Sequence, residues 1–457
     1  MVIDKKDILW NYIATFFKLA SSLILLPIIL SIMPEEKVAF WIIFITISSF
    51  AALLDFGFAP SFTRNVTYVF SGVKALKVTG FQQLKTNKNQ VDYSLLKALI
   101  SSMKWFYLRV ALFFFLIVVT LGTYYINHLL KSYDGDHIEI YISWTILIFT
   151  SFYNLLTLYY DSLLQGKGLI KKSKQIFVFG QLIYLVLASS FLLLGYGLYS
   201  VFISHLISFV VIRYLSYQAF FTIEIKRKLS IYQKIPTSEI LDIIKPNAIK
   251  VGLTSLGGFL VSRSSIIIGS LFVTLPEIAS YGISLQVVKV IGGIAIIYLA
   301  TYQPKIVEFR VSDDLDSIKQ IYLKGLIILV ISYLAFGFFL FLFGPHLLDF
   351  LGSKTQLLSS SYLILLLFIA FLENNHANAG NILLTGNEVP FFKSSLIAGL
   401  LTIIILPIML IFLKLEILSM ILAPGIAHLY NNWKWPYEVF KLLKIKFKDF
   451  FIILKHF

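Results

Sequence analysis

The run FLENNHANAGNILLTG places a carboxylate, a histidine and four asparagines directly after the strongly apolar run SSSYLILLLFIA. On a helix Asn374, Asn378 and Asn381 share one face, because they follow one another after four and then three residues. Polar groups are costly in hydrocarbon unless a water-filled cavity or buried partners satisfy them. We expect these asparagines, with Glu373 and His376, to line a polar cavity. A helix-packing seam held by amide hydrogen bonds is the alternative.

Basic residues also fall inside apolar runs. A base at the centre of a membrane span costs roughly 2.5 to 3.5 kcal/mol, so it must reach the headgroups, pair with an acid or face water. Arg263, in GGFLVSRSSIIIGS, and Lys289, in ISLQVVKVIGGIA, lie too deep to reach the headgroups, and Lys18 is a third such base. Arg64 and Arg213 lie near an expected edge, where long side chains extend to the interface.

Bases that face an internal cavity would give it a positive potential. Such a cavity suits an anionic ligand such as a pyrophosphate, because arginine offers a planar bidentate fork and lysine a point charge. The candidate residues for this anion site are Arg263, Lys289, Lys18 and Arg64.

Three carboxylates, Asp55, Asp161 and Glu373, also lie inside apolar runs. They are candidates for ion coupling or for pairing with the bases. A structural ion pair between Arg263 and Glu373 is the main alternative to a ligand site. His376 is a candidate proton carrier, although a lone histidine is more often a hydrogen-bonded structural residue.

Two pairs of similar segments indicate an internal repeat. Asn11 in KKDILWNYI and Asn247 in EILDIIKPNAI each open an apolar run behind an acidic lead-in. LLQGKG and LLTGNE each close a later run, with Gly166 and Gly386 in matching places. These pairs predict a chain built from two halves, and we expect both asparagines to line the polar cavity.

The composition indicates a membrane protein. Of the 457 residues, 58% are hydrophobic and only 14% are charged, whereas about a quarter are charged in soluble proteins. The formal charge of +15 is scattered between apolar runs, which argues against nucleic acid as a partner. The chain has no cysteine, and no metal-ligand set or nucleophile with a base stands at motif spacing. We therefore expect no catalytic residue, metal or cofactor.

Runs of about 20 apolar residues predict twelve membrane spans. The predicted spans are residues 8–33, 38–61, 105–130, 138–165, 176–196, 198–222, 246–274, 278–303, 322–345, 357–385, 390–412 and 416–435. About 28 of the 39 Lys and Arg residues fall at the termini or in even-numbered loops, which predicts that both termini are cytoplasmic.

The predicted architecture is an all-α integral membrane protein with twelve transmembrane helices in two six-helix lobes. We expect an N-terminal lobe at residues 1–223, a cytoplasmic linker at 224–245 and a C-terminal lobe at 246–435. Residues 436–457 alternate bases with large apolar residues, which predicts a basic cytoplasmic tail that forms an interfacial helix.

These features together resemble a known family. The resemblance is carried by the twelve spans in two halves, the opening asparagine-containing segment, the stretch LLDFGFAPSFTRNVTYVFSG at the end of the second span, and the LLQGKG and LLTGNE exits. They resemble the Wzx-type O-antigen and polysaccharide flippases of the multidrug/oligosaccharidyl-lipid/polysaccharide (MOP) exporter superfamily. The resemblance covers essentially the whole chain and implies a two-lobed, MATE-like fold.

The resemblance also implies a function. The protein would move undecaprenyl-pyrophosphate-linked oligosaccharide repeat units from the cytoplasmic to the periplasmic leaflet of the bacterial inner membrane, by alternating access through a central cavity. The implied partners are this polyprenyl-pyrophosphate-linked glycan, the lipid bilayer and polysaccharide assembly proteins of lipopolysaccharide biosynthesis. No nucleic acid is expected.

Two other classes stay open. A multidrug antiporter of the same superfamily would need a cavity dominated by carboxylates for organic cations, whereas bases predominate here. A membrane polysaccharide polymerase or glycosyltransferase usually carries a large outside loop, and the outside loops here, such as MPEEK and LPE, are short.

Overall fold

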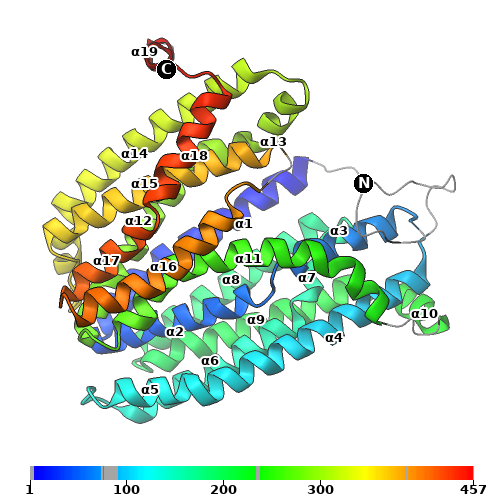
Figure 1. Cartoon of the computed structure of the whole chain (residues 1–457). Helices are drawn as coiled ribbons and strands as arrows, with labels where there is room; N and C mark the ends of the chain where they lie inside the picture. The colour runs from blue at the N-terminus through cyan, green and yellow to red at the C-terminus, as the bar shows by residue number, and fades with distance from the viewer. Residues whose placement is uncertain (1–4, 74–75, 77–90, 233–236, 387–388, 456–457) are drawn as a thin grey trace. The chain divides into compact units, whose positions relative to one another are not determined.

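The computed structural model describes residues 5–73, 76, 91–232, 237–386 and 389–455. Regular secondary structure in these residues is helical throughout (Figure 1). The helices are α1 (Lys5–Ile32), α2 (Glu35–Leu53), α3 (Phe58–Phe70), α4 (Tyr93–Ile117), the π-helix η1 (Val118–Gly122), α5 (Thr123–Leu130), α6 (His137–Thr157), α7 (Tyr159–Gly166), α8 (Ile170–Leu193), α9 (Leu198–Phe220), α10 (Ile223–Ile231), α11 (Thr237–Gly269), α12 (Leu275–Ala295), α13 (Ile297–Val311), α14 (Leu315–Phe350), α15 (Ser360–Leu384), α16 (Phe392–Ile411), α17 (Glu416–Ala427), α18 (Leu429–Leu442) and α19 (Phe447–Lys455).

The chain is a multi-pass membrane protein. Among the described residues, nine helical segments are long and apolar enough to cross a membrane. Each of the twelve predicted spans coincides with one helix or with consecutive helices, so the predicted all-α architecture is confirmed. Helix α15 is not among these nine segments because its second half is polar. Helices α17 and α18 are not among them because the helix is interrupted at His428.

The helices form two compact units. Unit 1 contains Met1–Met33 and Phe44–Ser255, and unit 2 contains Pro34–Ile43 and Leu256–Phe457. The first part of α2 belongs to unit 2, where Ile42 fills the space beside Gly282 of α12. The predicted ranges of the lobes, linker and tail stay predictions.

One helix of unit 1 begins well before the membrane span that the sequence predicts within it. The span predicted to begin at residue 105 is part of a helix that begins at Tyr93. Asp92 caps this helix, because its carboxylate accepts a hydrogen bond from the Leu95 amide at 3.0 Å. The longer α4 buries Leu96 and Leu99 in the core of unit 1.

In unit 2, polar side chains on neighbouring helices bond a backbone carbonyl that a proline in α17 leaves free. Pro424 has no amide hydrogen, so it cannot bond the carbonyl of Met420 one turn earlier. That carbonyl instead accepts hydrogen bonds from Ser265 Oγ at 3.0 Å and from Tyr281 Oη at 3.2 Å. The kinked helix is thereby tied to α11 and α12.

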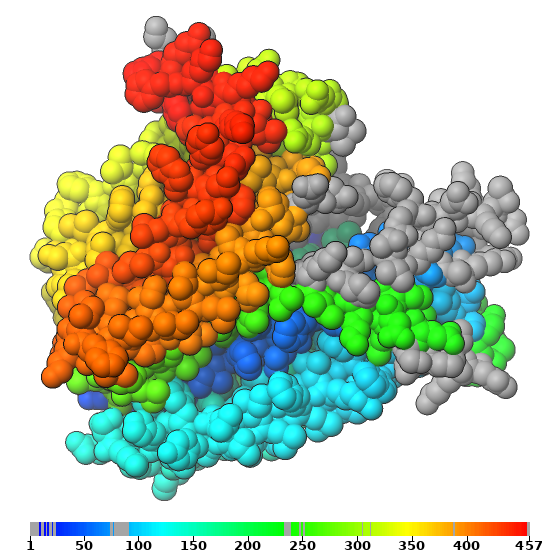
Figure 2. Space-filling view, in the orientation of Figure 1, coloured from blue at the N-terminus to red at the C-terminus, as the bar shows by residue number. Residues whose placement is uncertain are grey.

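The end of the chain packs on unit 2. Ile453 of α19 is buried against Leu323 and Ile327 of α14, and Lys319 pairs with Asp449 at 2.6 Å. α18 and α19, red in Figure 2, lie on the face of unit 2 that this view shows. The interfacial placement predicted for this tail stays a prediction.

Helices α11 and α16 approach closely at two glycines. A Cβ atom on Gly257 would lie 2.5 Å from the carbonyl oxygen of Ser395, and one on Gly399 would lie 2.8 Å from the carbonyl oxygen of Gly257. Small residues at such crossings allow membrane helices to pack backbone against backbone. Gly258, the next residue along α11, has open space at the same position.

We predict that Gly257→Ala destabilises the protein and that Gly258→Ala does not. The added methyl group at 257 meets backbone, which cannot move aside as a side chain can, and such overpacking typically costs about 1 to 3 kcal/mol. The measurement is the thermal midpoint of each purified variant in detergent. Equal midpoints for the two variants would contradict the close crossing.

Candidate functional site

Two basic residues lie in the membrane-spanning part of unit 2. Arg263 on α11 is half-buried, and Lys289 on α12 is exposed although it stands near the middle of its helix. Lys289 is within electrostatic reach of both Arg263 and Glu373. Within the described part of the chain, Arg263 makes no hydrogen bond or ion pair. The structural pair with Glu373, the alternative to a ligand site, is therefore not seen among the described residues.

Glu373 of α15 faces a pair of histidines. Its Oε1 lies 3.7 Å from Nδ1 of His428, at the junction of α17 and α18. The His428 ring stands edge-on to the His376 ring, with centroids 4.8 Å apart. Nδ1 of His376 lies 2.6 Å from Oδ1 of Asn432. Glu373 and His376 are therefore brought together, and α18 supplies further polar groups beside them.

The three asparagines on one face of α15 have different surroundings. Nδ2 of Asn374 donates to the Tyr333 hydroxyl at 2.6 Å and is packed against Gly292, where a Cβ would overlap it. Asn378 is buried, and Asn381 is exposed. Asn374 thus belongs to a helix-packing seam, which is the alternative reading of that position.

Asp55 lies in the turn between α2 and α3, where Gly57 has a positive φ of 70°. Its carboxylate accepts hydrogen bonds from the Tyr107 hydroxyl at 2.6 Å and from the Ala59 amide at 3.1 Å. A carboxylate at this place stabilises the first turn of α3. The geometry gives Asp55 a structural contact in unit 1.

Asp161 and Arg213 form an ion pair in unit 1, in which the arginine is buried and the aspartate is partly exposed. The Asp161 carboxylate lies 2.8 Å from Nη1 of Arg213, whose Nη2 donates to Oδ1 of Asn154, also at 2.8 Å. Arg213 is only 3% exposed. The expectation that Arg213 extends to the interface is therefore wrong, because its side chain is buried inside the bundle and its two terminal nitrogens bond to an acid and an amide on neighbouring helices.

The remaining predicted residues divide into two groups. Arg64 is exposed on α3. The side chains of Lys18, Asn11 and Asn247 lie outside the described residues, although their backbones belong to α1 and α11. Their predicted roles stay predictions.

Sequence reasoning missed His428 and Asn432. Both stand in AHLYNNW at the end of the last predicted span, a polar run similar to the one on α15. Such a run within an apolar span was the available signal. Tyr333, the partner of Asn374, carries no comparable signal, because tyrosine is common in membrane helices.

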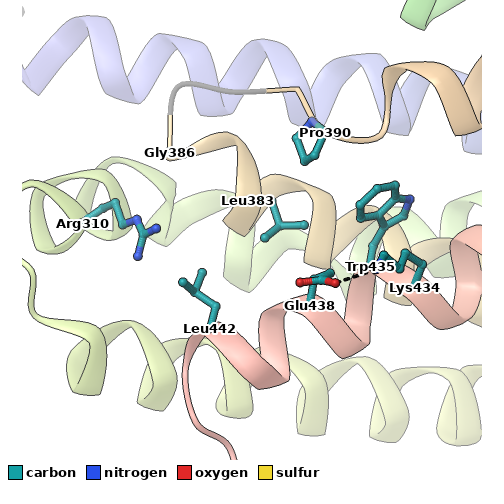
Figure 3. A pocket seen from close by; sticks show the side chains of 8 residues that line it. All are labelled: Arg310, Leu383, Gly386, Pro390, Lys434, Trp435, Glu438 and Leu442. Carbon is teal, nitrogen blue, oxygen red and sulfur yellow. Dashed lines mark hydrogen bonds and ion pairs between the residues drawn. The ribbon is translucent and has the colours of Figure 1, made fainter.

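Each unit contains a cavity. The cavity of unit 2 has a volume of about 510 Å³ and lies between α13, the end of α15 and α18. Figure 3 shows Arg310 on one side of it and the Lys434–Glu438 ion pair, 2.7 Å long, on the other. The cavity of unit 1 has a volume of about 380 Å³ and lies beside the Asp161–Arg213 pair.

The fold is shared with solved membrane transporters. The structure of lipid II flippase MurJ in an inward closed conformation aligns with a TM-score of 0.65 at 15% identity, covering 98% of this chain and 90% of that one. An inward-facing multidrug resistance MATE transporter of the MOP superfamily aligns with a TM-score of 0.62 at 15% identity, covering 94% of each chain. No protein-family model and no curated relative matches the sequence.

These alignments define the class of fold. The chain has the two-lobed, all-helical MOP fold that MATE transporters and MurJ share. The identity is too low for the alignments to carry more than the fold.

We predict that Asp161→Asn lowers the thermal stability of the protein. Removing one partner of a fully buried ion pair typically costs about 3 to 5 kcal/mol, and the partial exposure of Asp161 should reduce this to about 2 kcal/mol. The measurement is the thermal midpoint in detergent. Glu438→Gln, which breaks the surface pair with Lys434, is the control and should leave the midpoint unchanged. Equal midpoints for Asp161→Asn and wild type would contradict the assignment.

Proposed function

We propose that this protein is a flippase for an anionic, lipid-linked oligosaccharide. In the full form of the proposal, it moves undecaprenyl-pyrophosphate-linked repeat units from the cytoplasmic to the periplasmic leaflet by alternating access. The observation that carries the proposal is the pair of bases, Arg263 and Lys289, in the membrane-spanning core of unit 2.

The charges around these bases favour an anion. Lys289 lies within electrostatic reach of Arg263 and of one carboxylate, Glu373, so the two bases keep an excess of positive charge over that carboxylate. An unpaired guanidinium at this depth is costly, and a bound phosphate group would satisfy it with two parallel charge-assisted hydrogen bonds. Lys289 is exposed, which leaves its ammonium group available as a second contact.

The fold supports transport of a lipid-linked substrate. MurJ, whose structure aligns over nearly the whole chain, is named as a flippase of lipid II. The shared fold supports the proposal of a similar task for this chain, and the bases supply the reason to expect a phosphate in the substrate.

A multidrug exporter of organic cations is the second candidate. It is favoured by the fold shared with a multidrug resistance MATE transporter and by the carboxylate of Glu373 in unit 2. Lys289, within electrostatic reach of that carboxylate and of Arg263, repels an organic cation, so the described charges favour the flippase.

The finer assignments belong to the same proposal. They are Wzx-type specificity for O-antigen or another surface polysaccharide, a place in the bacterial inner membrane with both termini cytoplasmic, and contact with polysaccharide assembly proteins.

We predict that Arg263→Ala fails to restore surface polysaccharide in a host that lacks the gene, whereas wild type restores it. Loss of a charged hydrogen bond costs about 1.5 to 3 kcal/mol, or roughly tenfold or more in affinity. Arg263→Lys should restore part of the function, since the charge is kept and the bidentate fork is lost.

The control variant is Arg109→Ala, because Arg109 is exposed and lies over Trp105, with its guanidinium carbon 3.5 Å from the ring centroid. Each variant is compared at equal membrane levels. Normal complementation by Arg263→Ala would remove the principal support for an anion site. A deletion that leaves surface polysaccharide intact would overturn the proposed function.

A further inference from the structure

The cavity of unit 1 contains polar side chains that lack partners. It lies between α1, α7, α8 and α9 and has a volume of about 380 Å³, within the ~300 to 1,000 Å³ range of small-molecule sites. Gln165, Gln181 and Ser216 line it. Throughout the described ranges, no hydrogen bond joins these three side chains to another residue, and Ser216 is only 1% exposed.

Gln165 and Gln181 are half-buried, so part of each amide is open to the cavity, where water or a polar ligand can supply the hydrogen bonds. Each glutamine side chain offers both donors and acceptors. Adjacent hydroxyl groups of a sugar are also both donors and acceptors. One hydroxyl can donate to the amide oxygen while its neighbour accepts from the amide nitrogen.

Aromatic rings also line this cavity, and Phe209 packs edge-on against His205, a further lining residue, with ring centroids 4.6 Å apart. Phe177 of α8 and Phe209 of α9 contribute to the same cavity as the glutamines. The face of an aromatic ring carries negative charge density, and the C–H face of a pyranose ring presents the complementary surface. Hydroxyl-binding amides beside two phenyl rings match both faces of a carbohydrate.

The charges exclude one competing ligand class. The carboxylate of Asp161 is neutralised by Arg213 at 2.8 Å, and Lys174 adds a positive charge to the lining. An organic cation would therefore find no free carboxylate in this cavity among the described residues. A neutral polyhydroxylated ligand encounters no such repulsion.

We propose that the cavity of unit 1 is a binding site for a sugar unit of the transported glycan. The inference rests on the proposed function, and it adds a carbohydrate subsite in unit 1 to the anion site in unit 2. Gln165 and Gln181 bind the hydroxyl groups, and Phe177 and Phe209 contact the ring.

The test is photo-crosslinking of the full-length protein in its own membranes. A benzophenone amino acid replaces Phe177, and the probe is the lipid-linked glycan fraction extracted from the host. The same fraction after mild-acid removal of the glycan is the comparison probe. The matched control position is Phe179, which lies two residues further along α8 and is 51% exposed. Mass spectrometry of the adducts reports whether sugar is attached.

We expect adducts that contain sugar masses at position 177, none at position 179, and loss of these adducts with the acid-treated probe. In the background of Gln181→Leu, the yield at position 177 should fall at least fivefold. Adducts of lipid alone, or equal glycan adducts at both positions, would overturn this inference. If wild type complements the deletion while no glycan adduct forms at 177, the subsite fails and the flippase function stands. Failure of complementation would instead overturn both.

Discussion

A polar group inside the hydrocarbon region of a membrane needs a partner, because no bulk water is there to satisfy it. Two contacts show how the described helices meet this constraint. The carbonyl that Pro424 leaves free in α17 is bonded by Ser265 and Tyr281. In unit 1 the buried guanidinium of Arg213 is bonded by Asp161 and Asn154. Groups that break the pattern are therefore informative, since a ligand or water must take the place of the missing partner.

The two units differ in the kind of polar side chain that lacks a partner. In unit 2 one exception is a charge, because Arg263 has no partner in the described part of the chain and Lys289 is exposed at mid-helix. In unit 1 Asp161 and Arg213 are paired, and the side chains without a hydrogen-bond partner in the described residues include the neutral amides of Gln165 and Gln181 around a cavity. A substrate with a phosphate group and sugar units would satisfy both kinds of exception. This complementarity links the proposed function to the inferred subsite.

The sequence predicted the architecture well, because membrane spans are encoded by length and hydropathy. It was less successful within the spans. The Asp161–Arg213 pair joins α7 to α9, and no local pattern reveals which acid on one helix meets which base on another. The face shared by Asn374, Asn378 and Asn381 follows from helical spacing, but their different surroundings depend on Tyr333 and on neighbouring helices. The early start of α4 depends on the Asp92 cap, which lies before the apolar run.

The most direct measurement is the ligand preference of the purified protein in nanodiscs. Affinity would be compared for a polyprenyl pyrophosphate, the matching uncharged polyprenol and the organic cation tetraphenylphosphonium. An anion site at Arg263 predicts that the pyrophosphate binds at least about tenfold more tightly than the other two, and that Arg263→Ala abolishes the difference. Equal binding of the polyprenol, or tighter binding of the cation, would contradict the central claim.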